Sequence, residues 1–199
     1  LPVIFCGREG AFRTLRDRYA PDAEHAVGFY VVWLDRLYLL NFDSADSRRA
    51  VTERVLLLER QYQERQVGRS AAAADWTAWR ERTLQRIHAA ARRETLATIR
   101  HEGAHQFMHT TGVHSEYHAE NDWLVEGLAT WCELPELGRP DPTRVDMLAA
   151  RRRAGLPPAL PDLVNARRFA SLGERPDVSY AWSWLLVDWL MQPAQRAAF

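Results

Sequence analysis

Lysine is absent from the sequence: all 26 basic residues among its 199 residues are arginine. The simplest explanation is a coding bias toward arginine, but the absence also limits the chemistry. A Schiff-base mechanism and the phosphate-binding P-loop both require a lysine side chain. The sequence therefore excludes both classes of mechanism.

An excess of positive charge is also absent, because 26 acidic residues balance the 26 arginines. Proteins that bind nucleic acid carry a basic excess on the binding face, so we expect no nucleic-acid partner. Long apolar runs are missing as well. The longest, residues 178–191, is interrupted by Asp188 and is too short to span a bilayer, so no transmembrane segment is expected.

Cysteine is scarce, and Cys6 and Cys132 match no CxxC spacing of metal or redox sites. They form either one disulfide or two buried thiols. The chain begins at Leu1 and not at Met, which suggests a processed or excised fragment. The compartment is not determined by the sequence, with an extracytoplasmic or secreted location favoured. The oligomeric state is not determined either.

The order of patterns along the chain predicts an α+β fold, because strands come early and helices late. At 47% hydrophobic residues, the chain has enough apolar surface for a core. We expect a single domain, 1–199, made of a strand-rich lead-in with a helix (1–70), two metal-site helices (71–134) and a helical C-terminal part (135–199). The expected strands are 3–6, 26–34 and 37–41, with Asp35 and Arg36 as a hairpin turn between the last two. The expected helices are 9–19, one begun by Ser44, Asp46 or Ser47, 75–110, 122–133, 143–154 and 177–191.

The long helix carries the motif His101-Glu102-Gly103-Ala104-His105. Residues four apart on a helix lie one turn above each other, so both imidazoles point to the same side. Two neutral imidazoles on one face supply half of a tetrahedral zinc site. Glu102 lies about 100° further round the helix, where its carboxylate can reach a water molecule on the metal without ligating the metal itself. The alternative is a chance pair of surface histidines.

A third ligand is expected because catalytic zinc sites use three protein ligands and leave one position open. The metzincin pattern is excluded, since Thr111 stands where its third histidine would be and Met108 replaces its glycine. Glu126 lies within the apolar segment Trp123-Leu-Val-Glu-Gly-Leu-Ala129, and a buried lone carboxylate requires a partner such as a cation. The alternative is a Glu126 that caps its helix or faces solvent.

The HEGAH motif, followed about twenty residues later by WLVEGLA, resembles the gluzincins, the peptidase MA-like zinc metallopeptidases. The resemblance is closest to a bacterial branch of largely uncharacterised function. Two weaker matches flank the motifs: Gly28-Phe29-Tyr30 resembles a Gly-x-Tyr strand, and residues 180–186 resemble a late Tyr-x-x-x-Trp-x-Leu helix. The resemblance implies a zincin-like fold in which a small early sheet packs on the long active-site helix.

The resemblance also implies roles for individual residues. His101, His105 and Glu126 would ligate one zinc ion, and Glu102 would be the general base of peptide-bond hydrolysis by metal-activated water. Tyr180 would donate a hydrogen bond to the oxyanion, although tyrosines in apolar helices are more often packing residues. The implied partner is a peptide or protein substrate. A silent zincin-like domain used for binding or structural organisation is the alternative function.

Two secondary features follow from the same reasoning. Glu133 lies two turns beyond Glu126 and could orient a ligand histidine; Thr130 is an equal candidate, and both could instead face solvent. In related enzymes an edge strand along the cleft pairs with extended substrate, and residues 28–33 are the candidate for that edge.

Overall fold

The computed structural model describes residues 2–24, 26–42, 46–65, 70–113, 121–137, 139, 141–156, 160–165 and 175–196. These residues form two compact units, one of residues 1–31 and 36–98, and the other of residues 32–35 and 99–199. One long helix runs from the first unit into the second. Each unit is described by itself below.

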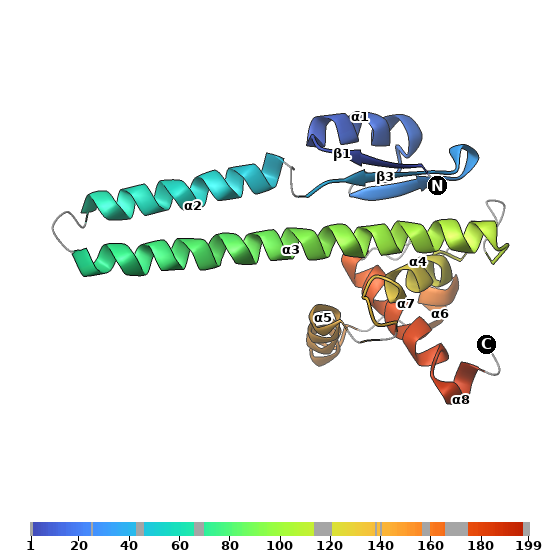
Figure 1. Ribbon diagram of the computed structural model, residues 1–199. Coiled ribbons are helices and arrows are strands. Elements are labelled where there is room, and N and C mark those ends of the chain that lie inside the picture. The colour runs from blue at the N-terminus through green and yellow to red at the C-terminus, as the bar shows by residue number, and fades with distance from the viewer. Residues whose placement is uncertain are drawn as a thin grey trace. The chain divides into compact units, whose positions relative to one another are not determined.

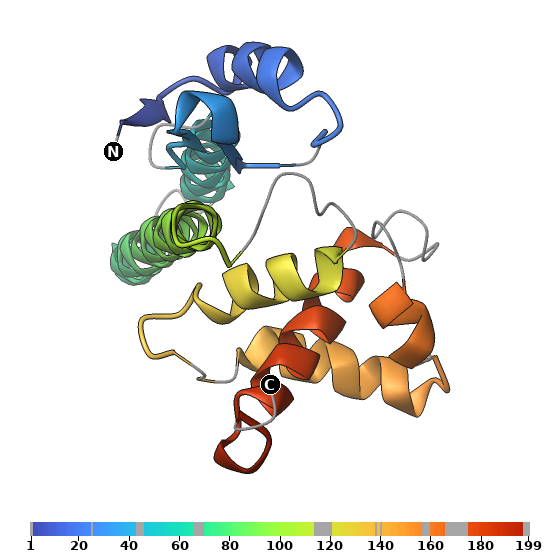
Figure 2. The same cartoon turned by 90° about the vertical axis from the view of Figure 1, so that its right-hand side faces the viewer.

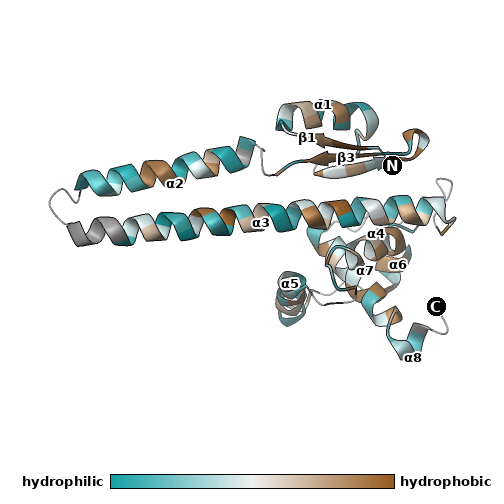
Figure 3. Cartoon of the chain, viewed as in Figure 1, coloured by the Kyte–Doolittle hydropathy of each residue, from teal (hydrophilic) through white to brown (hydrophobic). Residues whose placement is uncertain are grey.

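The first unit is built on a mixed sheet of three strands: β1 (Val3–Cys6), β2 (Gly28–Val31) and β3 (Arg36–Leu40). β3 is central, parallel to β1 and antiparallel to β2. Strands β1 and β3 are hydrophobic, brown in Figure 3, and Leu39 of β3 is fully buried. Short continuous apolar runs, with β-branched residues in β1 and aromatic residues in β2, explain why the sequence forms strands here.

Helix α1 (Glu9–Tyr19) packs on this sheet through aromatic side chains (Figure 1, blue). The Phe12 ring lies 5.6 Å from the Phe29 ring, which stacks on Tyr38 at 5.0 Å between centroids. Tyr19 stacks on the same Tyr38 ring at 5.5 Å. Such pairs add to the stability gained from burying apolar area. The core of the first unit is therefore an aromatic cluster between α1 and the sheet.

The predicted strand 26–34 is wrong in its second half. The chain leaves the sheet after Val31 and forms a 3₁₀ turn, η1 (Val32–Leu34), before β3 begins. Asp35 then adopts a left-handed conformation, with φ of 44°, which Asp tolerates better than most residues. Arg36 therefore belongs to β3, and the predicted two-residue hairpin turn is replaced by a longer connection.

Helix α2 (Asp46–Arg65) begins at one of the predicted positions; Ser44 lies outside the described residues. It is followed by α3 (Ser70–Thr110), a helix of 41 residues. Stacked rings of Tyr62, Trp76 and Trp79 join the two helices, with centroids 4.5 and 4.4 Å apart. Gly112, with φ of 75°, ends α3 in the left-handed conformation that favours glycine.

Within the described residues, the second unit contains the end of α3 and five further helices. These are α4 (Asp122–Trp131), α5 (Pro142–Arg153), α6 (Leu160–Asn165), α7 (Pro176–Leu190) and α8 (Pro193–Arg196). Helices α4, α5 and α7 confirm predicted helices to within about two residues, as boundaries commonly vary. The sequence did not predict α6, because Pro161 was interpreted as a loop signal although proline is tolerated in a first helical turn.

Helices α4 and α7 cross in close contact (Figure 2). A Cβ atom at Gly127 would lie 2.8 Å from the backbone oxygen of Ser183, so only glycine permits this approach. Thr130 is also buried on this face of α4. Gly127 thus lies against α7, while Glu126 starts about 100° round the helix from it.

The structure confirms the α+β class, with a small sheet early in the chain and helices after it. Packing of the sheet on the long helix and the single-domain organisation stay predictions. No helix among the described residues is long and apolar enough to cross a membrane. Cys6 and Cys132 are both free thiols, so the structure contains no disulfide between them.

Candidate metal centre

The two histidines of the HExxH motif lie together on the last three turns of α3, as predicted. Their Nε2 atoms are 3.2 Å apart and their rings meet edge to face. Both side chains are largely buried, with exposed fractions of 13% and 15%. The pair is therefore an enclosed feature of the second unit and not a pair of surface histidines.

Glu126 of α4 completes a three-residue group. Its Oε2 lies 3.1 Å from His101 Nε2 and 3.4 Å from His105 Nε2. The ligand atoms of all three residues lie within 4.8 Å of one another, a group that could hold a metal ion. Glu126 therefore lies against the two histidines, at 23% exposure of its side chain, and its predicted contact with a cation stays a prediction.

A bound metal ion sets the distances between its ligand atoms. Zinc binds nitrogen and oxygen at about 2.0–2.1 Å in tetrahedral geometry, which places neighbouring ligand atoms about 3.3 Å apart. The three observed separations of 3.1, 3.2 and 3.4 Å agree with that value. The donor set, two imidazoles and one carboxylate, is also one that zinc prefers. The residues present therefore fit a zinc ion.

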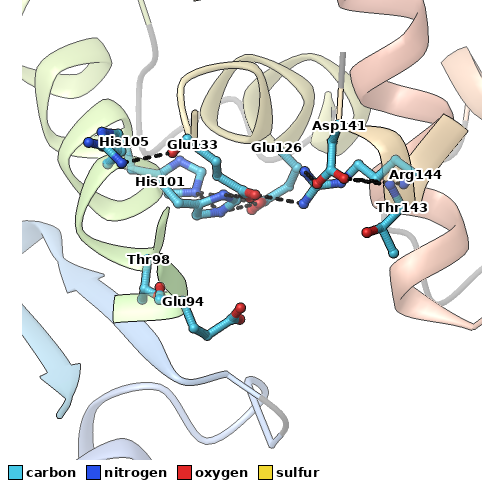
Figure 4. Close-up of polar contacts among 10 residues, drawn as sticks. Glu94, Thr98, His101, His105, Glu126, Glu133, Asp141, Thr143 and Arg144 are labelled. Carbon is cyan, nitrogen blue, oxygen red and sulfur yellow. Dashed lines mark hydrogen bonds and ion pairs between the residues drawn. The ribbon is translucent and has the colours of Figure 1, made fainter. Parts of the chain in front are cut away.

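Glu133 contacts the far side of one of these histidines (Figure 4). His101 donates from Nδ1 to Glu133 Oε1 at 2.9 Å. This contact leaves Nε2 of the same ring directed at Glu126 and His105. A carboxylate on the second ring nitrogen fixes the orientation of a metal-ligating histidine.

Of the two candidates for that role, the structure selects Glu133 over Thr130. Glu133 contacts His101 directly. It lies beyond the end of α4 at Trp131, and not two turns along the helix face as the sequence suggested. Thr130 is 2% exposed against α7, and its hydroxyl has no hydrogen-bond partner among the described residues.

Glu102 lies beside the two histidines and is 8% exposed. Burial raises the pKa of its carboxyl, while the positive charges of His101 and His105 oppose that rise. The net direction is upward. A carboxylate with a raised pKa holds a proton more readily, which suits a group that accepts and returns one.

Tyr180 of α7, which the resemblance assigns to the site, lies next to this group of residues. Its ring lies 6.0 Å from the His101 ring. Burial raises the pKa of the phenol, and the negative charges of Glu126 and Glu102 and a hydrogen bond to Glu126 raise it further. Tyr180 is therefore a neutral hydrogen-bond donor at any ordinary pH.

His101 and Glu126 shift each other's pKa values. Burial lowers the pKa of His101, but hydrogen bonds to Glu126 and Glu133 outweigh that effect and bring it to about 10. Burial raises the pKa of Glu126, yet His105 and His101 together lower it below its ordinary range. Without a metal, the group is therefore held together by a positive imidazole between two carboxylates.

An apolar cavity of about 670 Å³ also lies between α3 and the end of α4. It is lined by Gly103, Ala104 and Phe107 from α3 and by Leu128 and Trp131 from α4, among others. None of the three candidate ligands lines it. The cavity is therefore separate from the metal centre.

Comparison with known families identifies the part of the chain that holds this centre. Residues 95–199, just over half of the chain, match the family described as "Protein of unknown function (DUF1570)". The chain belongs to this family. No curated protein and no solved structure matches it. The description of DUF1570 assigns no activity, but its span includes every candidate residue of the centre, from His101 to Tyr180.

Sequence reasoning missed one contributor within the DUF1570 span. Arg144 of α5 contacts Glu133 at 2.6 Å from the opposite side to His101. The sequence predicts a helix over 143–154, which places Arg144 in its first turn, but nothing in the pattern connects that turn with Glu133. The edge prediction for residues 28–33 holds in part: β2 is an edge strand, but Val32 and Trp33 belong to η1.

Proposed function

We propose that this chain is a zinc-dependent, zincin-like metallopeptidase that hydrolyses peptide bonds. The observation that carries the proposal is the triangle of His101, His105 and Glu126, whose ligand atoms have the separations of a tetrahedral zinc site. The resemblance of HEGAH and WLVEGLA to the gluzincins supports the same assignment, with a fourth position left for water or substrate.

A zinc ion held by these three side chains would lower the pKa of water toward about 7 and polarise the scissile carbonyl. Glu102 accepts the proton from the attacking water at its carboxylate and delivers it to the leaving amine. Its burial favours this role, because a raised pKa brings the carboxyl closer to neutral pH. The proton thus moves from water to Glu102 and then to the product amine.

Tyr180 is proposed to stabilise the charge that develops on the carbonyl oxygen. Its phenol stays protonated and lies beside the proposed ligands, so its single O–H would exchange the hydrogen bond to Glu126 for one to an oxyanion at low local dielectric. Glu133 holds the His101 ring through Nδ1, which keeps Nε2 available as a ligand.

Hydrolysis of a peptide library tests the proposal. We expect cleavage that a zinc chelator abolishes and that added zinc restores, because every proposed step depends on the ligand triangle. Zinc-loaded protein that cleaves no peptide would contradict a peptidase and favour the silent alternative. In that case the metal would act on stability alone, measured as a lower melting temperature of the metal-free protein.

A further inference from the structure

Glu133 is held in a defined position although it lies outside the helices. It lies in the non-helical segment after α4, so no helix backbone fixes its side chain. Its carboxylate is nevertheless only 15% exposed and directed at His101. The backbone N–H of Glu133 donates to the Thr130 carbonyl of α4 at 3.2 Å, and two arginines from other helices contact Glu133 as well.

Arg144 contacts the carboxylate itself. Its Nη2 donates to Glu133 Oε2 at 2.6 Å, while His101 Nδ1 donates to Oε1. Each oxygen thus has its own partner, which fixes both the place and the plane of the carboxylate. Arg100 of α3 adds a second contact, from Nη1 to the backbone oxygen of Glu133 at 3.2 Å.

The Arg144 side chain is in turn fixed by the start of its own helix (Figure 4). Asp141 caps α5 by accepting from the backbone N–H of Thr143 at 2.8 Å and of Arg144 at 3.4 Å. Its other oxygen accepts from Arg144 Nη1 at 3.0 Å. The guanidinium therefore bridges two carboxylates with different nitrogens, which a lysine ammonium could not reproduce in this geometry.

From these contacts we infer that Arg144 is a positioning residue of the metal centre, acting through Glu133 on the His101 ligand. Hydrogen bonds thus connect the α5 cap with the proposed zinc site: Asp141 contacts Arg144, Arg144 contacts Glu133, and Glu133 contacts His101. The inference rests on the proposed function, because it assigns Arg144 an effect on zinc binding. Neighbours that orient a ligand typically affect metal affinity by about 10- to 100-fold.

A double-mutant cycle measured by zinc affinity tests this inference. The proteins are wild type, Arg144→Gln, Glu133→Gln and the double variant, and the dissociation constant is measured by chelator competition. We expect Glu133→Gln to weaken binding about 10- to 100-fold and Arg144→Gln about 10-fold. The double variant should bind no more weakly than Glu133→Gln, because Arg144 has no effect on zinc except through Glu133.

Arg139→Gln is the matched control. Arg139 also forms an ion pair with a glutamate, Glu136, but with exposed fractions of 62% and 71% for the two side chains, so its loss should leave zinc affinity unchanged. Melting temperatures establish that each variant is folded. If Arg144→Gln does not fold, Arg144→Lys takes its place in the cycle, since it keeps the charge but not the bridge.

The possible outcomes distinguish the role of Arg144 from the proposed function. Unchanged zinc affinity in the Arg144 variant, or effects of the two substitutions that simply add, would overturn the role of Arg144 and leave the zinc site intact. Wild-type protein that binds no zinc would overturn the proposed function and this inference together.

Discussion

Replacing Glu102 with glutamine should reduce the rate of peptide hydrolysis by about 10²- to 10⁴-fold, the usual contribution of a general base. The amide has nearly the same shape but cannot accept a proton from water. Glu102 is not one of the three residues whose atoms form the ligand triangle, so zinc content should not change. The measurement is the turnover number on a cleaved library peptide, with zinc content determined on the same samples.

Glu94→Gln is the control for this prediction. Glu94 lies on α3 about two turns before His101, and its side chain is exposed. The same chemical change at this position should leave hydrolysis at the wild-type rate. Undiminished hydrolysis by the Glu102 variant would show that the proton is accepted elsewhere.

Zinc affinity should rise steeply with pH, by about 10-fold per unit between pH 7 and 9. In the metal-free protein the pKa of His101 is brought to about 10, since its contacts with Glu126 and Glu133 outweigh the effect of burial. The ring is therefore protonated at neutral pH, and zinc must displace one proton to bind at Nε2. Chelator competition at pH 7, 8 and 9 measures the slope, and an affinity that stays flat over this range would contradict it.

The raised pKa of His101 also predicts that the metal-free protein becomes less stable as the pH rises. A histidine whose pKa is higher in the folded state than its ordinary value of about 6.5 contributes stability that is complete below that value. The contribution is lost as the pH rises toward about 10. Chelator-treated protein should thus melt at lower temperature at pH 9 than at pH 7, while its affinity for zinc increases.

The group of His101, His105 and Glu126 could be predicted from the sequence because its geometry is local or chemically forced. The spacing of His101 and His105 fixes them on one face of a helix whatever the rest of the chain does. Glu126 could be selected because a lone carboxylate among Trp, Leu and Val residues needs a cationic partner. The glycine signal likewise predicted the end of α3 at Gly112. The predicted start at Asp75 is wrong, because α3 begins at Ser70 and alanines, which favour helices, fill its first turn.

The surroundings of the ligands could not be predicted, because they depend on contacts between segments far apart in the sequence. The role of Glu133 depends on where α4 stops, and helix ends are set by tertiary contacts as well as by propensity. Arg144 is eleven residues further on, and no periodicity connects it with Glu133. The strand 26–34 was overestimated because its apolar residues continue into η1, where Asp35 turns the chain.

The central claim is that His101, His105 and Glu126 hold one zinc ion, and its most direct test is the metal content of protein purified without added zinc. The account predicts one zinc ion per chain in the wild type, lost on substitution of any of the three by alanine and kept in Glu102→Gln. Wild-type protein without stoichiometric zinc, or ligand variants that retain it, would contradict the account.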